Sequence, residues 1–205
     1  GCNFRCAFCQ NWQTSQVLCD KEVDSDWLGV REINAERLVS IALQNGAAGI
    51  ASSYNEPFIS VEWAVEIFKL AKHAGLKTAF VSNGFATPES LAFLRPWLDG
   101  LKVDLKSMND ERYRQMGGRL QPVLDTIRSA HEAGLWVEVV TLVIPGFNDS
   151  TEELWEAGRF IASTSLDIPW HVTAYQPDYK MMEEKETPSS TLQRAAEIGE
   201  EDGLH

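Results

Sequence analysis

Apolar positions along most of this chain alternate between two spacings. From residue 33 on, stretches with apolar residues every three or four positions predict helices. These stretches cover about 34–46, 60–74, 87–98, 122–133 and 150–161. Short runs rich in β-branched and aromatic residues follow each helix and predict strands. The runs cover 49–53, 78–81, 101–105, 136–144 and 168–175. Helices that alternate with strands in this way predict right-handed βαβ units and a parallel sheet.

The ends of the predicted helices carry recognisable capping residues. Asn34 can cap the first helix, and Thr87-Pro88 places an N-cap before a proline at the first helical position. Ser150 and Glu153 have the spacing of a capping box. These local residues therefore support the positions of three helix starts.

The same pattern predicts an α/β fold in one domain over residues 1–205, an open parallel TIM-type barrel. A helix-ending Gly-Leu pair precedes a strand at Gly75-Leu76 and at Gly134-Leu135, so Gly203-Leu204 predicts one more strand after His205. The chain opens on Gly1 and not on Met, and we expect a first strand to lie before Gly1, so that the barrel is truncated there. An open doubly wound sheet is the alternative.

Composition narrows the range of partners. The net charge of -12 argues against a nucleic-acid partner, because such binding depends on Lys and Arg contacts to phosphate. No apolar run approaches the ~20 residues of a membrane span, and no signal peptide is present. Thiols grouped at metal-binding spacing suit a reducing cytoplasm. We therefore expect a cytoplasmic protein with neither nucleic acid nor membrane as its partner.

The first nine residues hold the chemistry that stands out most. Cys2, Cys6 and Cys9 form a C-x3-C-x2-C pattern, which can turn three sulfurs toward one metal centre. Three ligands suit a [4Fe–4S] cluster with an open fourth iron, whereas an electron-transfer cluster has four. The alternatives are a structural zinc site with Cys19 as fourth ligand, and a non-catalytic iron–sulfur electron carrier. A disulfide framework fits poorly, since the loop is tight and the chain is not a small secreted scaffold.

Polar residues follow the predicted strands at the points where each strand ends. In a parallel barrel these ends collect the functional groups. The segments are 53–57, 82–84, 104–106, 144–146 and 175–177. Alternation along a strand places Asp104 and Lys106 on the same side and Leu105 on the other. Solvated loop starts, and an internal Asp104–Lys106 ion pair, are the alternative interpretations.

Residues 1–12, Gly-Cys-Asn-Phe-Arg-Cys-Ala-Phe-Cys-Gln-Asn-Trp, resemble the cluster loop of the radical S-adenosylmethionine (SAM) superfamily, with Phe8 as the aromatic before the third cysteine. The resemblance runs to the C-terminus. It is closest to pyruvate formate-lyase activating enzymes and to the radical SAM member of the AmmeMemoRadiSam system, the latter through segments such as Tyr54-Asn55-Glu56-Pro57. It implies a radical SAM core domain with a six-stranded partial (β/α)6 barrel.

The resemblance also implies cofactors and contacts. Cys2, Cys6 and Cys9 would bind the [4Fe–4S] cluster. The residues that would contact SAM are Phe8, Gln10, Asn55, Glu56, Ser82, Asn83, Asp104, Lys106, Val143 and Gln176. The chain departs from the family pattern at three places. Tyr54-Asn55 replaces two glycines, Ser82 stands where a threonine is usual, and Gln176 stands where the activating enzymes usually carry a histidine.

The implied activity is that of an oxidoreductase of the glycyl-radical-activating type. A one-electron donor of flavodoxin or ferredoxin type would reduce the cluster. SAM would then be cleaved to a 5′-deoxyadenosyl radical, which abstracts hydrogen from a protein or small-molecule substrate. The sequence does not indicate which substrate this is.

Overall fold

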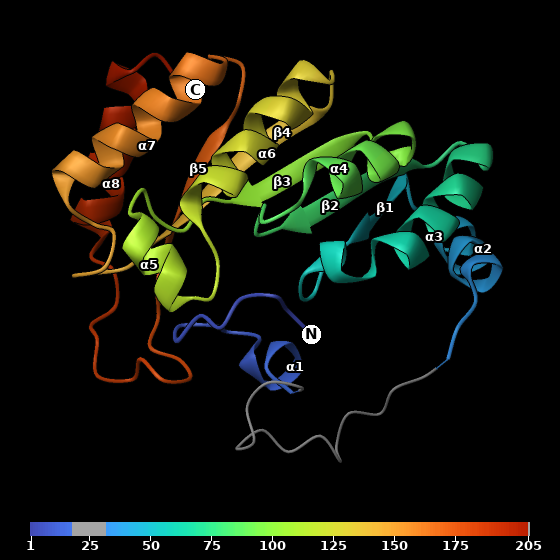
Figure 1. The fold of residues 1–205 in the computed structure, drawn as a ribbon, viewed down its shortest axis with the longest axis horizontal. Coiled ribbons are helices and arrows are strands. Elements are labelled where there is room, and N and C mark those ends of the chain that lie inside the picture. Colours follow the sequence, from blue (N-terminus) through green and yellow to red (C-terminus); the bar gives the residue numbers. More distant parts are fainter. Residues whose placement is uncertain (18–31, 205) are drawn as a thin grey trace.

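The computed structural model describes residues 1–17 and 32–204 of the chain. Within these residues one sheet is formed, and all its strands are parallel (Figure 1). Its strands are β1 Gly49–Ser52, β2 Lys77–Ser82, β3 Gly100–Asp104, β4 Trp136–Val143 and β5 Trp170–Ala174. The spatial order β1-β2-β3-β4-β5 repeats the chain order. The predicted open parallel α/β fold is therefore confirmed. The alternative of a doubly wound sheet is wrong, because that fold reverses its strand order.

The helices lie between and after these strands. They are α1 Trp12–Ser15, α2 Ala35–Gln44, α3 Val61–His73, α4 Pro88–Leu94, α5 Asp110–Gln115, α6 Leu120–Glu132, α7 Thr151–Thr164 and α8 Ser189–Glu201, with short 3-10 turns η1 Pro57–Ser60 and η2 Arg95–Trp97. The five predicted helices correspond to α2, α3, α4, α6 and α7. The short α1 and α5 and the C-terminal α8 have no counterpart among the predicted helices. None of the described helices is long and apolar enough to span a membrane.

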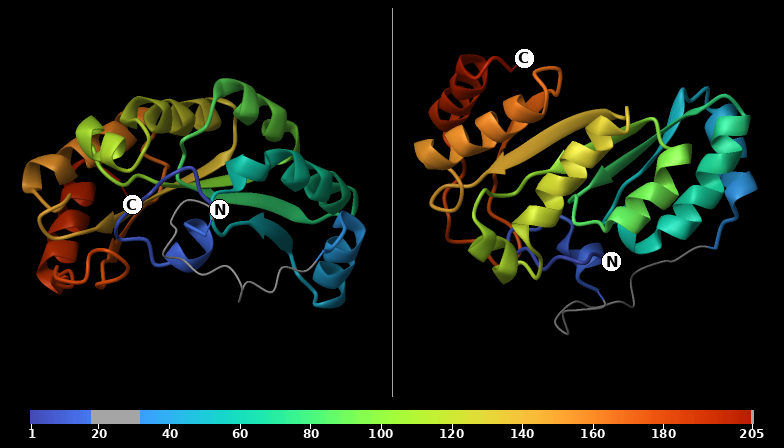
Figure 2. Two further views of the ribbon diagram at one scale, coloured as in Figure 1. Left: turned by 60° about the horizontal axis from the view of Figure 1, so that its bottom comes forward. Right: turned by 45° about the horizontal axis from the view of Figure 1, so that its top comes forward.

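The two faces of the sheet have different environments because side chains alternate along each strand. Phe80, Val103 and Val139 are fully buried in the core under the helices. Their neighbours Lys102 and Val140 point to the opposite face and line a cavity. Figure 2 shows the helices arched over one side of the curved sheet and the N-terminal segment on the other. The sheet therefore has a concave face on which the cysteine loop lies.

The capping predictions hold in two cases and in part in the third. Asn34 accepts a hydrogen bond from the backbone N–H of Arg37, and Thr87 forms a capping box with Ser90. Ser150 accepts from the N–H of Glu153 at 3.2 Å, as expected for an N-cap.

The second half of the predicted Ser150–Glu153 capping box is wrong. The Glu153 carboxylate accepts from the backbone N–H of Met108 at 2.9 Å and from Ser107 and Arg112. Glu153 accepts from these three donors instead of from the backbone N–H of Ser150, and it therefore links α7 to the loop after β3. The strands expected before Gly1 and after His205 lie outside the chain and stay predictions, as does the one-domain organisation of residues 1–205.

Candidate active site

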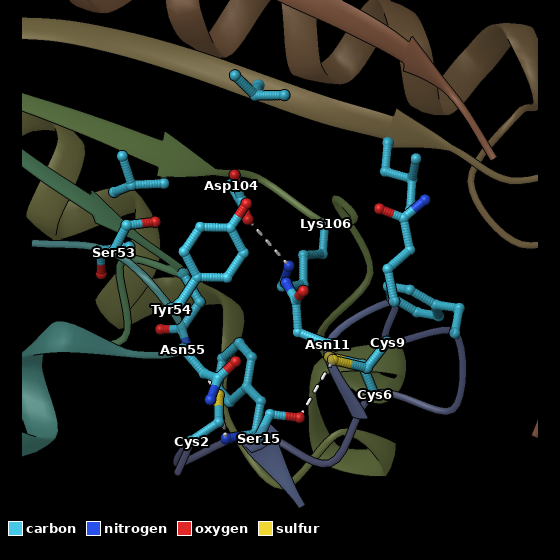
Figure 3. Close-up of a pocket in the computed structure, with 18 of the residues that line it drawn as sticks. Cys2, Cys6, Cys9, Asn11, Ser15, Ser53, Tyr54, Asn55, Asp104 and Lys106 are labelled. Carbon is cyan, nitrogen blue, oxygen red and sulfur yellow. Dashed lines mark hydrogen bonds and ion pairs between the residues drawn. The ribbon is translucent and has the colours of Figure 1, made fainter. Parts of the chain in front are cut away.

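A cavity of about 340 Å³ opens at the C-terminal ends of the strands, between the cysteine loop and the concave face of the sheet (Figure 3). Its volume falls in the ~300–1,000 Å³ range of small-molecule sites. The N-terminal segment contributes Cys2, Phe4, Cys6, Phe8, Cys9, Gln10, Asn11, Ser15 and Gln16 to its lining. The strands and their loops contribute Ser53, Tyr54, Asn55, Val81, Ser82, Asn83, Lys102, Asp104, Lys106, Val140, Leu142 and Thr173. Segments far apart in sequence thus form one site.

The cysteine loop is anchored by the turn after α5. Phe4 is fully buried, with its ring centroid 5.8 Å from that of Tyr113 and 5.3 Å from that of Phe85. The backbone N–H of Arg5 donates to the carbonyl of Met116 at 2.8 Å. Anchoring by a buried ring and a backbone bond fixes the loop relative to the sheet.

The three thiols of the loop differ in their surroundings. Burial raises the pKa of Cys2 and raises the pKa of Cys6 to about 12. The thiol of Cys6 lies 3.5 Å from the thioether sulfur of Met116. The thiol of Cys9 lies 3.2 Å from the hydroxyl of Ser15. The burial of Cys2 and Cys6 therefore favours the protonated thiol until a metal takes the proton's place.

These donors fit an iron–sulfur cluster better than a single zinc ion. Among the described residues no three His, Cys, Asp or Glu side chains lie close enough to hold one metal ion. In a cluster each thiolate binds a different iron, so its sulfurs need not converge on one point. Soft thiolates are the ligands that iron–sulfur clusters select. Cys19, the fourth ligand of the zinc alternative, lies outside the described residues.

Opposite the cysteine loop, Asp104 is shared between two lysines. Its oxygens lie 2.8 Å from the Nζ of Lys102 and 3.4 Å from the Nζ of Lys106. Burial by itself would raise the pKa of Asp104, but the Lys106 and Lys102 ammonium groups hold it below its ordinary value. Burial would lower the pKa of Lys106, and Asp104 raises it above its usual range. Both shifts favour the charged forms of Asp104 and Lys106, and the pair predicted from the strand pattern gains Lys102 as a third member.

Glu56 closes the site from behind. The side chain is buried, and its carboxylate accepts from the backbone N–H of Asn83 at 2.7 Å, from the hydroxyl of Ser82 at 2.8 Å and from the N–H of Phe58 at 3.0 Å. Burial raises the pKa of Glu56, against the lowering effect of the Asn83 and Phe58 donors. Glu56 thus caps η1 and also joins the end of β1 to the end of β2.

Comparison with known proteins decides the family. The family model described as the Radical SAM superfamily matches residues 1–161, more than half of the chain. The chain belongs to the radical SAM superfamily.

Three similar proteins show how much of the chain has relatives of known sequence. An uncharacterized protein of Methanocaldococcus jannaschii is 32% identical over the whole chain, which covers 59% of that protein. The isethionate sulfite-lyase activating enzyme of Oleidesulfovibrio alaskensis is 30% identical over 68% of the chain and 47% of its own length. The pyruvate formate-lyase 1-activating enzyme of Escherichia coli (strain K12) is 24% identical over 99% of the chain and 87% of its length. The chain thus spans only about half to three fifths of the first two relatives.

A solved structure shows the same fold. Streptococcus suis SuiB bound to S-adenosylmethionine superposes with a TM-score of 0.70 at 16% identity, covering 96% of this chain and 44% of that one. The open parallel sheet is therefore a partial TIM-type radical SAM barrel, as the sequence predicted.

The structure brings most of the residues predicted for SAM contact to the cavity of this radical SAM fold. Phe8, Gln10, Asn55, Ser82, Asn83, Asp104 and Lys106 line it together with Cys2, Cys6 and Cys9. Glu56 lies directly behind, bonded to Ser82 and Asn83. The resemblance to radical SAM proteins and the strand-end positions therefore identified residues that lie together in the structure, and their contact with SAM stays a prediction.

Val143 and Gln176 are not among the residues that line the cavity. Val143 is fully buried on the helix side of β4, where it packs with Leu154 and Ile198. Alternation turns its neighbour Leu142 toward the cavity instead. Gln176 is exposed beyond the end of β5.

Other residues of the cavity were missed by the sequence reasoning. Lys102 is two residues before Asp104, so the alternation that paired Asp104 with Lys106 could have identified it. Ser15 and Gln16 carried no such indication, because α1 is a single short turn without apolar periodicity. Their position became visible only in the fold.

Proposed function

We propose that this chain is the core of a radical SAM enzyme of the activating-enzyme type. Cys2, Cys6 and Cys9 would hold a [4Fe–4S] cluster with one open iron, and SAM would occupy the remainder of the cavity. When bound, the cluster and SAM supply one-electron cleavage of the sulfonium to methionine and a 5′-deoxyadenosyl radical. That radical would take a hydrogen atom from the substrate. The observation that carries the proposal is that three motif thiols and a half-buried Asp–Lys pair line one cavity.

The charged residues of the cavity suit the two ends of SAM. The ammonium of Lys106 would bind the carboxylate of the methionine moiety, and Asp104 would bind a ribose hydroxyl or a cationic group. Lys106 and Lys102 together lower the pKa of Asp104, and the ammonium of Lys102 lies 2.8 Å from that carboxylate. These charges would orient the ligand in a half-buried site, where electrostatic interactions are stronger than in bulk solvent.

The loops around the cavity would complete the site. Glu56, with Ser82 and Asn83, holds the backbone ends of β1 and β2 against each other, so that Asn55 is presented at the cavity wall. Phe8 packs edge-on against Phe147 at 5.3 Å, which fixes the loop segment before Cys9. Such positioning is what the protein contributes when a cofactor carries the chemistry.

The partners follow from the same proposal. An external one-electron donor of flavodoxin or ferredoxin type would reduce the cluster in a reducing, cytoplasmic setting. The substrate would be a protein, as the names of the activating-enzyme relatives suggest, or a small molecule. The Tyr54-Asn55-Glu56-Pro57 segment favours a member of the AmmeMemoRadiSam group within this type.

Electron paramagnetic resonance of the intact protein, reconstituted with iron and sulfide without oxygen and then reduced, tests the proposal. We expect a [4Fe–4S]⁺ spectrum that changes when SAM is added, and loss of the spectrum in Cys6→Ala. Cys19→Ala is the matched thiol control and should keep both the cluster and its response to SAM. A spectrum indifferent to SAM, or lost in Cys19→Ala, would support an electron carrier instead. Bound zinc without iron would refute the mechanism.

A further inference from the structure

The sulfur of Cys9 has a buried hydroxyl beside it. Ser15 Oγ lies 3.2 Å from Cys9 Sγ, and Figure 3 draws this contact as a dashed line. The side chain of Ser15 is only 1% exposed, so water does not compete for it. The backbone between the two residues is wound into a turn by bonds from Trp12 N to Cys9 O and from Ser15 N to Asn11 O. Helix α1 thereby brings the hydroxyl back onto the sulfur.

The neighbouring amide of Gln16 sets the direction of this hydrogen bond. Its Nε2 lies 3.0 Å from the carbonyl oxygen of Phe4 and 3.0 Å from Ser15 Oγ. A carbonyl oxygen can only accept, so the amide nitrogen of Gln16 must face it, and the same nitrogen donates to Ser15. Because the oxygen of Ser15 accepts from Gln16, its own proton is available for Cys9. Gln16 is 2% exposed, so this relay of donors is closed to solvent.

The other two motif sulfurs have no hydroxyl partner among the described residues. Cys2 Sγ faces the backbone N–H of Phe4 at 3.4 Å and the amide of Asn83 at 3.7 Å. Cys6 Sγ meets the thioether of Met116, which is not a donor. Hydrogen bonds to cluster sulfurs stabilise the negative charge that reduction adds, and they raise the reduction potential. The surroundings of Cys9 therefore differ in kind from those of Cys2 and Cys6.

We propose that Ser15, oriented by Gln16, is a positioning residue that donates a hydrogen bond to the Cys9 sulfur and raises the reduction potential of the cluster. The inference rests on the proposed function, since it requires that Cys9 bind the cluster. Ser15→Ala removes the donor and should shift the balance toward the oxidised cluster by up to about tenfold, which is about 59 mV for one electron.

A redox titration followed by electron paramagnetic resonance on the intact, reconstituted protein tests the relay. Iron per chain is measured first. Ser15→Ala should bind as much iron as the wild type at a lower potential, and Ser15→Thr, which keeps the hydroxyl, should restore the potential. Gln16→Met removes the orienting donor at similar volume and should shift the potential in the same direction. Thr14→Val is the matched control, because the Thr14 hydroxyl donates to Asn11 O and Asn55 Oδ1 and not to sulfur.

The outcomes separate this inference from the proposed function. Unchanged potentials in Ser15→Ala and Gln16→Met, with full iron content, overturn the relay and leave the proposed function standing. Loss of iron in Ser15→Ala together with an unchanged potential in Gln16→Met also overturns the relay, since the hydroxyl would then only support the fold. A wild-type protein that takes up no iron overturns both.

Discussion

Gly118 lies where any side chain would collide with the core of the cysteine loop. A Cβ built on Gly118 would stand 2.2 Å from Cε1 and 2.8 Å from Cζ of Phe4. Carbon atoms in contact are ordinarily ~3.5–4.0 Å apart, so in Gly118→Ala the ring of Phe4 or the turn must move by more than about 1 Å. Phe4 is fully buried between Tyr113 and Phe85, and the N–H of Gly118 is bonded to the carbonyl of Tyr113 at 2.8 Å. Neither side can move without disturbing the loop.

Overpacking of this kind in a filled core costs about 1–3 kcal/mol of unfolding free energy, and we expect Gly118→Ala to fall in that range. Displacement of Phe4 should also loosen the loop that carries Cys2 and Cys6, so the variant should retain less iron after reconstitution. Urea denaturation followed by circular dichroism measures the first effect. Iron analysis after gel filtration measures the second.

Gly100→Ala is the matched control for the same change. Its Cβ would meet nothing closer than 3.5 Å, an ordinary contact with the carbonyl oxygen of Trp136. We expect a change within about 0.5 kcal/mol, with iron content unchanged. Equal stability and equal iron retention in the two variants would refute the assignment of Phe4 and Gly118 as the anchor of the loop.

Three further substitutions test the charges. Burial would raise the pKa of Asp99, but hydrogen bonds from the Lys72 ammonium and the Thr78 N–H hold this pKa below its usual value. Asp99 therefore contributes stability above pH 3.8 that is lost as the pH falls through its lowered pKa. Asp99→Asn should cost about 1–2 kcal/mol at neutral pH, and urea titrations should show this cost vanishing in acid. The pKa of Glu56 is raised, so its contribution to folding stability is fully present below pH 4.5 and falls as the pH rises through its pKa in the folded protein. The same urea titrations should show the stability lost in Glu56→Gln shrinking from pH 4 to 7. A loss that grows with pH would contradict this sign. Asp104→Asn leaves two lysines without their counter-ion and should lower the free energy of unfolding by about 1–3 kcal/mol. The loss is smaller than for a fully buried pair because the carboxylate is partly exposed. Thermal melts that show no loss of stability would argue against the shared ion pair.

Much of the fold could be predicted because its determinants are local. Asn34 and Thr87 cap their helices through hydrogen bonds to backbone N–H groups three residues on. The strict alternation in β3 turns Leu101 and Val103 to the core, and it sends Lys102 and Asp104 to the cavity. These properties depend on neighbours in the chain, and a single sequence contains them.

From the sequence we could predict which residues of the candidate site lie close together, but not all of their contacts. The C-terminal ends of parallel strands share one edge, so polar residues placed there had to converge with the cysteine loop. The resemblance to radical SAM proteins did not indicate that the side chain of Val143 faces the helices and not the cavity, because a resemblance of segments does not fix which face a side chain takes; its contact with SAM stays a prediction. The sequence also could not give the partner of Glu153, whose carboxylate chose donors from 41 to 46 residues away over its own helix end.

The sequence by itself determined the parallel α/β pattern, the three-thiol motif and the same-side placement of Asp104 and Lys106, because spacing and alternation act within a few residues. Only the tertiary structure decided that Lys102 shares Asp104, that Glu56 joins two strand ends, and that Gln16 orients Ser15 toward Cys9. These contacts depend on how separate segments pack. Once packed, buried donors and acceptors are shielded from water and form hydrogen bonds with one another.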